Sequence, residues 1–211
     1  LIVDARDPDA HAQGHIAGSL SIPAGASFGT WLGWVVDEDR PVVLLVEDPD
    51  DLDDLARQAL RIGFETMVGH VAGGFEAWRA AGRPVEVGER LGLDTLASQL
   101  SAGGPEAPLV IDVRQPSEYG AGHVPGSRHI GAGDLPEMLD RLPRDRPIAM
   151  ICASGYRSSV AFSLLQSAGF TQVTAVDGGV PDWAAHGYPL EYGGTTDDPA
   201  APAATVEGHA H

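Results

Sequence analysis

The stretch that decides the fold is residues 147–158, which read PIAMI (147–151) and then CASGYRS (152–158). The first five residues are a short apolar run of the kind that forms a buried strand. From Ser159 onward apolar residues recur at helical spacing until Gly169 interrupts them. We therefore expect Cys152 in the turn between a strand and a helix, where unpaired backbone N–H groups and the positive end of the helix dipole face one concavity.

Cys152 is the only cysteine of the chain and has two interpretations. A free cysteine is often a small buried hydrophobe without chemistry. Here Gly155 permits a tight loop, Arg157 adds a fixed positive charge, and Ser158 is a candidate cap for the following helix. Because this environment favours a thiolate, we interpret Cys152 as a nucleophile.

The chain also contains an internal repeat. Asp4 and Asp112 mark the copies at an offset of 108 residues, and residues 41–45 (PVVLL) match residues 147–151 at an offset of 106. Other matched features are the pairs Gly14-His15 with Gly122-His123, Gly73-Gly74 with Gly178-Gly179, and Trp78 with Trp183. Such self-similarity predicts two copies of one domain.

The fold class follows from the apolar runs, which are short and alternate with helical patterns in each copy. This alternation predicts an α/β fold, with two domains that each have a parallel sheet covered by helices on both faces. Ligands of such sheets bind beyond the carboxyl ends of the strands, where Cys152 is expected. Residues 91–103 predict a helix capped by Asp94, with Leu96 and Leu100 on one face. Copy one has no counterpart of this helix, so we expect its domain to be incomplete at the N-terminus.

The connector and the tail complete the organisation. Residues 84–90 are too short a connector for freely swinging domains, so the two domains are expected to pack together. Residues 193–211 are poor in core-forming side chains and predict a flexible tail. Its His209 and His211 are not expected to bind a metal, since a site needs three or four converging ligands.

Composition limits the function classes. The chain has 211 residues and a formal net charge of −17, which argues against binding to nucleic acid. No apolar run is long enough to span a membrane, and a single cysteine allows no intrachain disulfide. We expect a soluble, cytoplasmic protein that binds neither nucleic acid nor membrane.

Copy one lacks the chemistry expected of copy two. An ungapped alignment from Pro41 and Pro147 places Val46 at the position of Cys152, and residues 47–52 (EDPDDL), four of which are acidic, where ASGYRS stands. Acids suit a helix N-terminus, but they would repel an anionic sulfur donor. Asp112, Arg114 and His123 recur in the inert copy, so we assign them, together with Glu118, to loop architecture. Trp78 and Trp183 are interpreted as packing anchors.

The motif CASGYRS, together with VIDVRQPSEYGAGHVPGS (110–127) and VDGGVPDW (176–183), resembles the rhodanese family of sulfurtransferases. The resemblance covers residues 93–191, and a weaker copy covers residues 1–86. It implies a tandem protein with an inactive rhodanese-like domain at 1–88, an active one at 89–192 and the tail at 193–211. It also implies that Cys152 takes a sulfane sulfur from thiosulfate or a small persulfide and passes it to cyanide, glutathione or another thiol. The persulfide would lie among the N–H groups of a loop made of Ala153, Ser154, Gly155, Tyr156, Arg157 and Ser158.

Several alternatives remain open. Phosphatases and arsenate reductases of related fold have five residues between Cys and Arg, whereas four separate Cys152 from Arg157. A sulfur- or anion-binding module and a persulfide carrier for an acceptor protein are further possibilities. Arg157 either clamps the anionic donor or pairs with a carboxylate. The sequence leaves the donor, the acceptor and the oligomeric state open, and it predicts no cofactor and no metal.

The aromatic segment 28–34 (FGTWLGW) has a simple interpretation as core between sheet and helix. It also resembles the tandem rhodanese part that follows a metallo-β-lactamase-type persulfide dioxygenase domain. That resemblance implies an upstream dioxygenase domain as a possible partner and sulfur exchange between Cys152 and glutathione.

Overall fold

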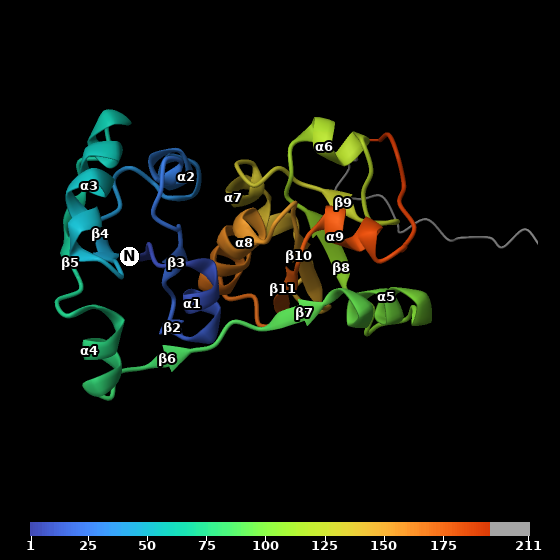
Figure 1. Ribbon diagram of the computed structural model, residues 1–211, viewed down its shortest axis with the longest axis horizontal. Helices are drawn as coiled ribbons and strands as arrows, with labels where there is room; N and C mark the ends of the chain where they lie inside the picture. The colour runs from blue at the N-terminus through green and yellow to red at the C-terminus, as the bar shows by residue number, and fades with distance from the viewer. Residues whose placement is uncertain (195–211) are drawn as a thin grey trace, which may run out of the picture.

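The computed structural model describes residues 1–194 as two α/β units joined by a short connector (Figure 1). The first unit consists of β1 (Ile2–Asp4), α1 (Pro8–Gln13), β2 (His15–Ile16), β3 (Leu20–Ser21), α2 (Phe28–Val35), β4 (Val42–Leu45), the 3₁₀ turn η1 (Pro49–Asp51), α3 (Leu52–Arg61), β5 (Met67–His70), α4 (Gly74–Ala80) and β6 (Val85–Glu86). The second consists of β7 (Arg90–Gly92), α5 (Leu93–Ala102), β8 (Leu109–Asp112), α6 (Pro116–Gly120), β9 (Arg128–His129), α7 (Leu135–Met138), η2 (Leu139–Arg141), β10 (Ile148–Ile151), α8 (Tyr156–Ser167), β11 (Val173–Asp177) and α9 (Val180–Ala185).

Both units have a parallel sheet, which confirms the predicted fold class. The first sheet has four strands in the order β3-β1-β4-β5, and the second has five in the order β7-β11-β10-β8-β9. The apolar runs of the repeat supply the inner strands, because strands buried on both faces need continuous apolar sequence. Each sheet also has a two-residue edge strand, β3 or β9, which is too short to leave an apolar run in the sequence.

The helix expected near the start of the second copy is present, but its start was predicted wrongly. Residues 90–92 form strand β7, and α5 begins at Leu93 with Gly92 at its N-cap position. Asp94 therefore lies inside the first turn, where its Oδ1 accepts a hydrogen bond from the Tyr188 hydroxyl at 2.7 Å. Leu93 and Leu96 are buried with Trp183, which confirms that this tryptophan is a packing anchor.

Helix α8 lies between the two units (Figure 1), and both units share one hydrophobic core that includes residues of this helix. Residues of β1 and β4 in the first unit and of β8 and β10 in the second belong to the same buried cluster as Val160, Ala161 and Leu165 of α8. The connector is held as well, since Gly88 N–H donates to the Ala12 carbonyl at 2.9 Å and Arg90 pairs with Asp9. The prediction that the units pack together is confirmed.

None of the helices in residues 1–194 is both long and apolar enough to cross a membrane. Most of the tail predicted at 193–211, including His209 and His211, lies outside the described residues.

Candidate active site around Cys152

Cys152 directly follows β10, at the carboxyl edge of the second sheet, as the sequence predicted. Its side chain is fully buried, and its Sγ accepts the backbone N–H of Gly155 at 3.2 Å. The Ser158 hydroxyl lies 3.5 Å from the same sulfur. A backbone N–H at this distance stabilises negative charge on sulfur, so the loop can hold an anionic sulfur species.

The loop is closed by Gly155, which adopts φ +89° and ψ −23° and serves as the N-cap residue of α8. This left-handed conformation is open to glycine and unfavourable for residues with a Cβ. Helix α8 then begins at Tyr156, so Ser158 lies within its first turn and does not cap it, contrary to the prediction. Its hydroxyl donates to the Gly155 carbonyl at 3.0 Å and thereby ties the loop to the helix.

Ala153 and Ser154 form the outer part of the loop, with Ser154 exposed to solvent. The turn Gly178-Gly179 packs against this part so closely that a Cβ on Gly179 would lie 2.0 Å from the Ala153 carbonyl oxygen. In addition, Val180 N–H donates to the Cys152 carbonyl at 2.9 Å. The second glycine is therefore required for the Cys152 loop to pack, a reason that its place in the repeat did not reveal.

Arg157 pairs with Glu118 of α6, the alternative that the sequence had left open. Its Nη1 and Nη2 donate to the two carboxylate oxygens at 2.5 and 2.7 Å. The hydrogen bonds from Arg157 lower the pKa of Glu118 to about 2, while the same pairing raises the pKa of Arg157. The pair thus stays charged throughout the neutral and mildly acidic range, and a donor-binding role for Arg157 stays a prediction.

The sequence pattern did not predict that Glu118 pairs with Arg157 of the Cys152 loop. Asp112, Arg114 and His123 recur in copy one, whereas the counterpart of Glu118 there is Ala10. The counterpart of Arg157 in the same copy is Asp51. The loss of both partners of an ion pair from one copy was the signal available in the sequence.

The other loop residues of the motif build the same scaffold in both units. Arg114 forms a buried ion pair with Asp112 and donates to the Gly122 carbonyl at 2.7 Å. Arg6 does the same with Asp4 and with the Gly14 carbonyl at 2.8 Å. His123 and His15 each hydrogen-bond through Nδ1 to the carbonyl four residues earlier. Their predicted role in loop architecture is confirmed.

One buried position differs between the two scaffolds. Tyr119 stacks on His123 with ring centroids 3.7 Å apart, and its hydroxyl donates to the Ser127 carbonyl at 2.6 Å. The corresponding His11 stacks on His15 at 4.0 Å, but its Nε2 is buried without a hydrogen-bond partner. Burial, followed by the nearby His15 and arginines, lowers the pKa of His11 to about 2. His11 is therefore a neutral histidine in the folded protein.

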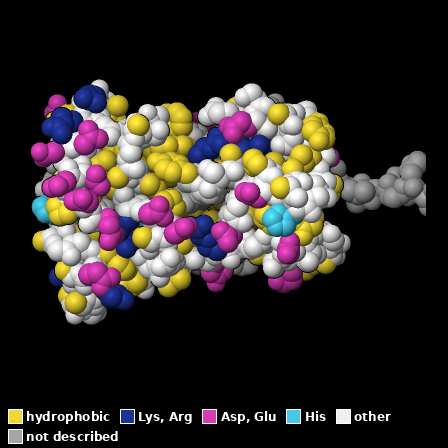
Figure 2. All heavy atoms as spheres, viewed as in Figure 1, with side chains coloured by type: hydrophobic (Ala, Val, Ile, Leu, Met, Phe, Trp, Pro, Cys, Tyr) yellow, Lys and Arg dark blue, Asp and Glu magenta, His cyan; other side chains and the backbone are white. Residues whose placement is uncertain are grey.

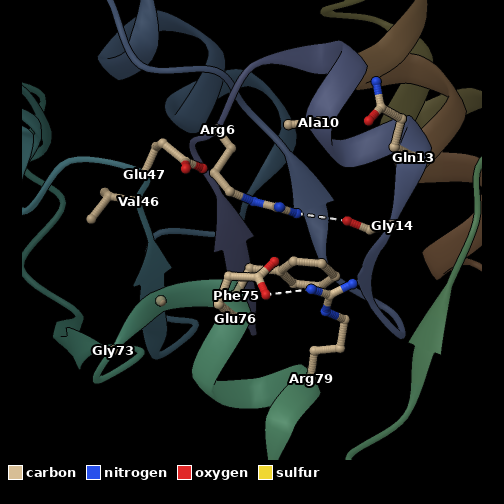
Figure 3. Close-up of a pocket in the computed structure, with 11 residues that line it drawn as sticks. Arg6, Ala10, Gln13, Gly14, Val46, Glu47, Gly73, Phe75, Glu76 and Arg79 are labelled. Carbon is tan, nitrogen blue, oxygen red and sulfur yellow. Dashed lines mark hydrogen bonds and ion pairs between the residues drawn. The ribbon is translucent and has the colours of Figure 1, made fainter.

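The first unit has a cavity of about 490 Å³ where the second has its loop (Figure 3). Val46, at the end of β4, and Glu47 line it together with the Gly73-Gly74 turn. Figure 3 shows its arginines already engaged, Arg6 with the Gly14 carbonyl and Arg79 with Glu76. The cavity therefore offers neither a nucleophile nor a free cation to an anionic donor.

Within residues 1–194 no group of three or more His, Cys, Asp and Glu side chains is arranged to hold a metal ion.

Known proteins that are similar to this chain include sulfurtransferases. The chain is 35% identical over 83 residues to the thiosulfate sulfurtransferase GlpE of Stutzerimonas stutzeri (strain A1501), which covers 39% of this chain and 75% of that protein. It is 33% identical over 82 residues to a sulfurtransferase of Allochromatium vinosum, covering 39% and 77%. Among solved structures, a thiosulfate sulfurtransferase from Pseudomonas aeruginosa aligns with 92% of this chain but only 40% of its own length, at 20% identity and a TM-score of 0.44.

The family model named rhodanese-like domain matches the chain twice, over residues 1–81 and 93–186. These two ranges coincide with the two copies of the repeat and with the two parallel sheets. The chain therefore belongs to the rhodanese-like family, with one such domain in each half.

Proposed function

We propose that the second domain is a sulfurtransferase that carries a sulfane sulfur on Cys152. The observation that supports this most directly is the Cys152 sulfur, held by the Gly155 N–H at 3.2 Å at the start of α8. The two relatives named above are called sulfurtransferases, and one of them a thiosulfate sulfurtransferase.

The proposed reaction has two steps. The Cys152 thiolate attacks the outer sulfur of thiosulfate, the S–S bond of the donor breaks, and sulfite leaves with the electron pair. An acceptor such as cyanide or a thiolate then attacks the outer sulfur of the persulfide, releasing thiocyanate or a new persulfide and restoring the thiolate. This is covalent, ping-pong catalysis, and it needs no external oxidant or reductant. A low-molecular-weight persulfide can replace thiosulfate in the first step.

Backbone N–H groups at the start of α8 would stabilise the terminal sulfur of the persulfide. Those of the first helical turn have no partner within the helix, and the helix dipole adds to their effect. Arg157 contributes positive charge nearby, although Glu118 offsets it. The first domain, with Val46 in place of the cysteine, takes no part in the chemistry.

Intact-protein mass spectrometry before and after incubation with thiosulfate tests the proposal. We expect a gain of one sulfur atom, lost again as thiocyanate on addition of cyanide, and no gain in Cys152→Ser. A gain that cyanide does not discharge would favour a binding or carrier module. Hydrolysis of an aryl phosphate without sulfur uptake would favour the phosphatase alternative.

A further inference from the structure

Helix α8 carries a polar stripe that faces the first domain. Tyr156, Ser159, Ser163 and Gln166 fall within about 80° of one another at 100° per residue, so they share one side of the helix. We call this side the docking face of α8. The remaining residues of the helix are mostly apolar and belong to the core.

Each residue of the docking face is bonded to the first domain. The Tyr156 hydroxyl donates to the Pro23 carbonyl at 3.3 Å, and the Ser159 and Ser21 hydroxyls lie 3.3 Å apart. The Ser163 hydroxyl accepts the backbone N–H of Ser21 at 2.9 Å. His15 Nε2 lies 3.0 Å from the side-chain oxygen of Gln166. The Tyr156 ring also lies against Trp31, with ring centroids 6.0 Å apart.

These contacts lie only a few covalent bonds and hydrogen bonds away from the Cys152 loop. Tyr156 follows Gly155, whose N–H is bonded to the Cys152 sulfur, and the Ser158 hydroxyl links the sulfur side of the loop to the Gly155 carbonyl. Ser158 and Ser163 are fully buried, so water cannot replace bonds lost on this helix without a change in packing. The start of α8 is therefore held in the second domain through Gly155 and from the first domain through Tyr156, whose hydroxyl donates to the Pro23 carbonyl.

We propose that the inactive first domain sets the position of the catalytic loop, and that Ser21 and Ser163 are positioning residues for the sulfur transfer. This rests on the function proposed above. Loss of the Ser163 hydroxyl, which accepts the Ser21 N–H, or of the Ser21 hydroxyl, which contacts Ser159, would let α8 shift relative to β10, and the amide that faces the sulfur would move with it. An error of about 1 Å at a reacting centre can cost a factor of about 100 in rate.

The structure supplies a matched control on the same helix. The Ser163 hydroxyl donates to the Val160 carbonyl within α8, and the Ser167 hydroxyl donates in the same way to the Leu164 carbonyl. Of these two serines, only Ser163 also accepts the Ser21 N–H. Comparing Ser163→Ala with Ser167→Ala therefore isolates the contact between the domains from the bond within the helix.

Two readouts separate positioning from simple stability. The first is kcat and KM for sulfur transfer from thiosulfate to cyanide, per folded molecule. The second is the pH profile of alkylation by iodoacetamide, which reports on Cys152 alone because the chain has one cysteine. For Ser163→Ala we expect kcat to fall about tenfold with little change in KM, and alkylation to require a higher pH. Ser167→Ala should match the wild type in both.

Ser21→Ala tests the same proposal from the other domain. It removes the hydroxyl that contacts Ser159, so it should move both readouts in the same direction even if Ser163→Ala does not fold. A lower melting temperature with unchanged kcat and an unchanged alkylation profile in Ser21→Ala would overturn the proposal. The docking face would then only stabilise the packing of the two domains. If the wild type takes up no sulfur, the proposed function fails. The alkylation profiles still decide whether the first domain positions the loop.

Discussion

Substitution of His11 by tyrosine should remove a loss of stability that the first domain suffers at acidic pH. His11 is buried, its Nε2 has no partner, and burial lowers its pKa from 6.5 to about 2. The folded protein therefore keeps His11 neutral, whereas the unfolded chain takes up a proton below about pH 6.5. Because the unfolded state binds more protons in this range, the free energy of unfolding falls as the pH falls through 6.5.

The size of the effect follows from proton linkage. Between pH 7.5 and pH 5.5 the proton taken up by unfolded His11 costs about 1.4 kcal/mol of stability. Tyrosine at this position would titrate only at alkaline pH, so that loss should disappear. Its hydroxyl would also be placed to donate to the Ser19 carbonyl, as Tyr119 does to Ser127, and a bond of this kind contributes about 1 kcal/mol.

Urea unfolding of wild type and His11→Tyr at pH 7.5 and pH 5.5 measures this difference. His186→Tyr is the control, because His186 is an exposed histidine. We expect the His11 variant to be more stable at both values of pH, with an advantage larger by about 1.4 kcal/mol at pH 5.5. The reasoning is refuted if wild type and variant lose the same stability on acidification.

Three further predictions concern the two loops. Glu118→Ala should lower KM for thiosulfate several-fold at low salt, because Arg157 loses its carboxylate partner and the local potential becomes more positive. The decrease in KM should be smaller at high salt, and an increase in KM would contradict this prediction. Arg157→Ala should raise KM for thiosulfate with little change in melting temperature; a large drop in melting temperature with unchanged turnover per folded molecule would assign Arg157 a purely structural role. Val46→Cys in a Cys152→Ser background should take up no sulfur from thiosulfate by intact mass, because Glu47 and the acidic residues after it replace the loop that holds the sulfur; any uptake would show that the loop is not required.

The sequence predicted the features that depend on local pattern. The apolar runs 41–45 and 147–151 gave strands β4 and β10, and the position of Cys152 at a strand end followed from them. The start of α5 was misplaced, because Asp94 suggests a cap wherever it stands near a helix start, and only pairing with β11 shows that residues 90–92 are a strand. The prediction that Ser158 caps the helix is wrong because the left-handed Gly155 lets α8 begin at Tyr156, before the apolar pattern of the helix starts.

The sequence pattern did not predict contacts between distant segments. The serines at 159 and 163 look like weak helix formers in isolation, and their purpose appears only when β3 of the other domain lies beside them. The pairing of Arg157 with Glu118 is of the same kind, because it joins α8 to α6 across 39 residues. The repeat carried part of this information, since both partners of that pair are absent from copy one.

The two halves together separate what the fold needs from what the chemistry needs. Both keep the buried Asp–Arg pair bonded to a glycine carbonyl and a histidine bonded four residues back, so these groups serve the fold. The half without a cysteine lacks the left-handed glycine, the arginine and its glutamate, and its Gly-Gly turn leaves a cavity where the other half is packed tight. A domain without the cysteine can differ at these positions, provided that it keeps the surface that contacts its neighbour. In this chain that surface is the edge strand β3, from which Ser21 forms hydrogen bonds to α8, the helix that follows the Cys152 loop.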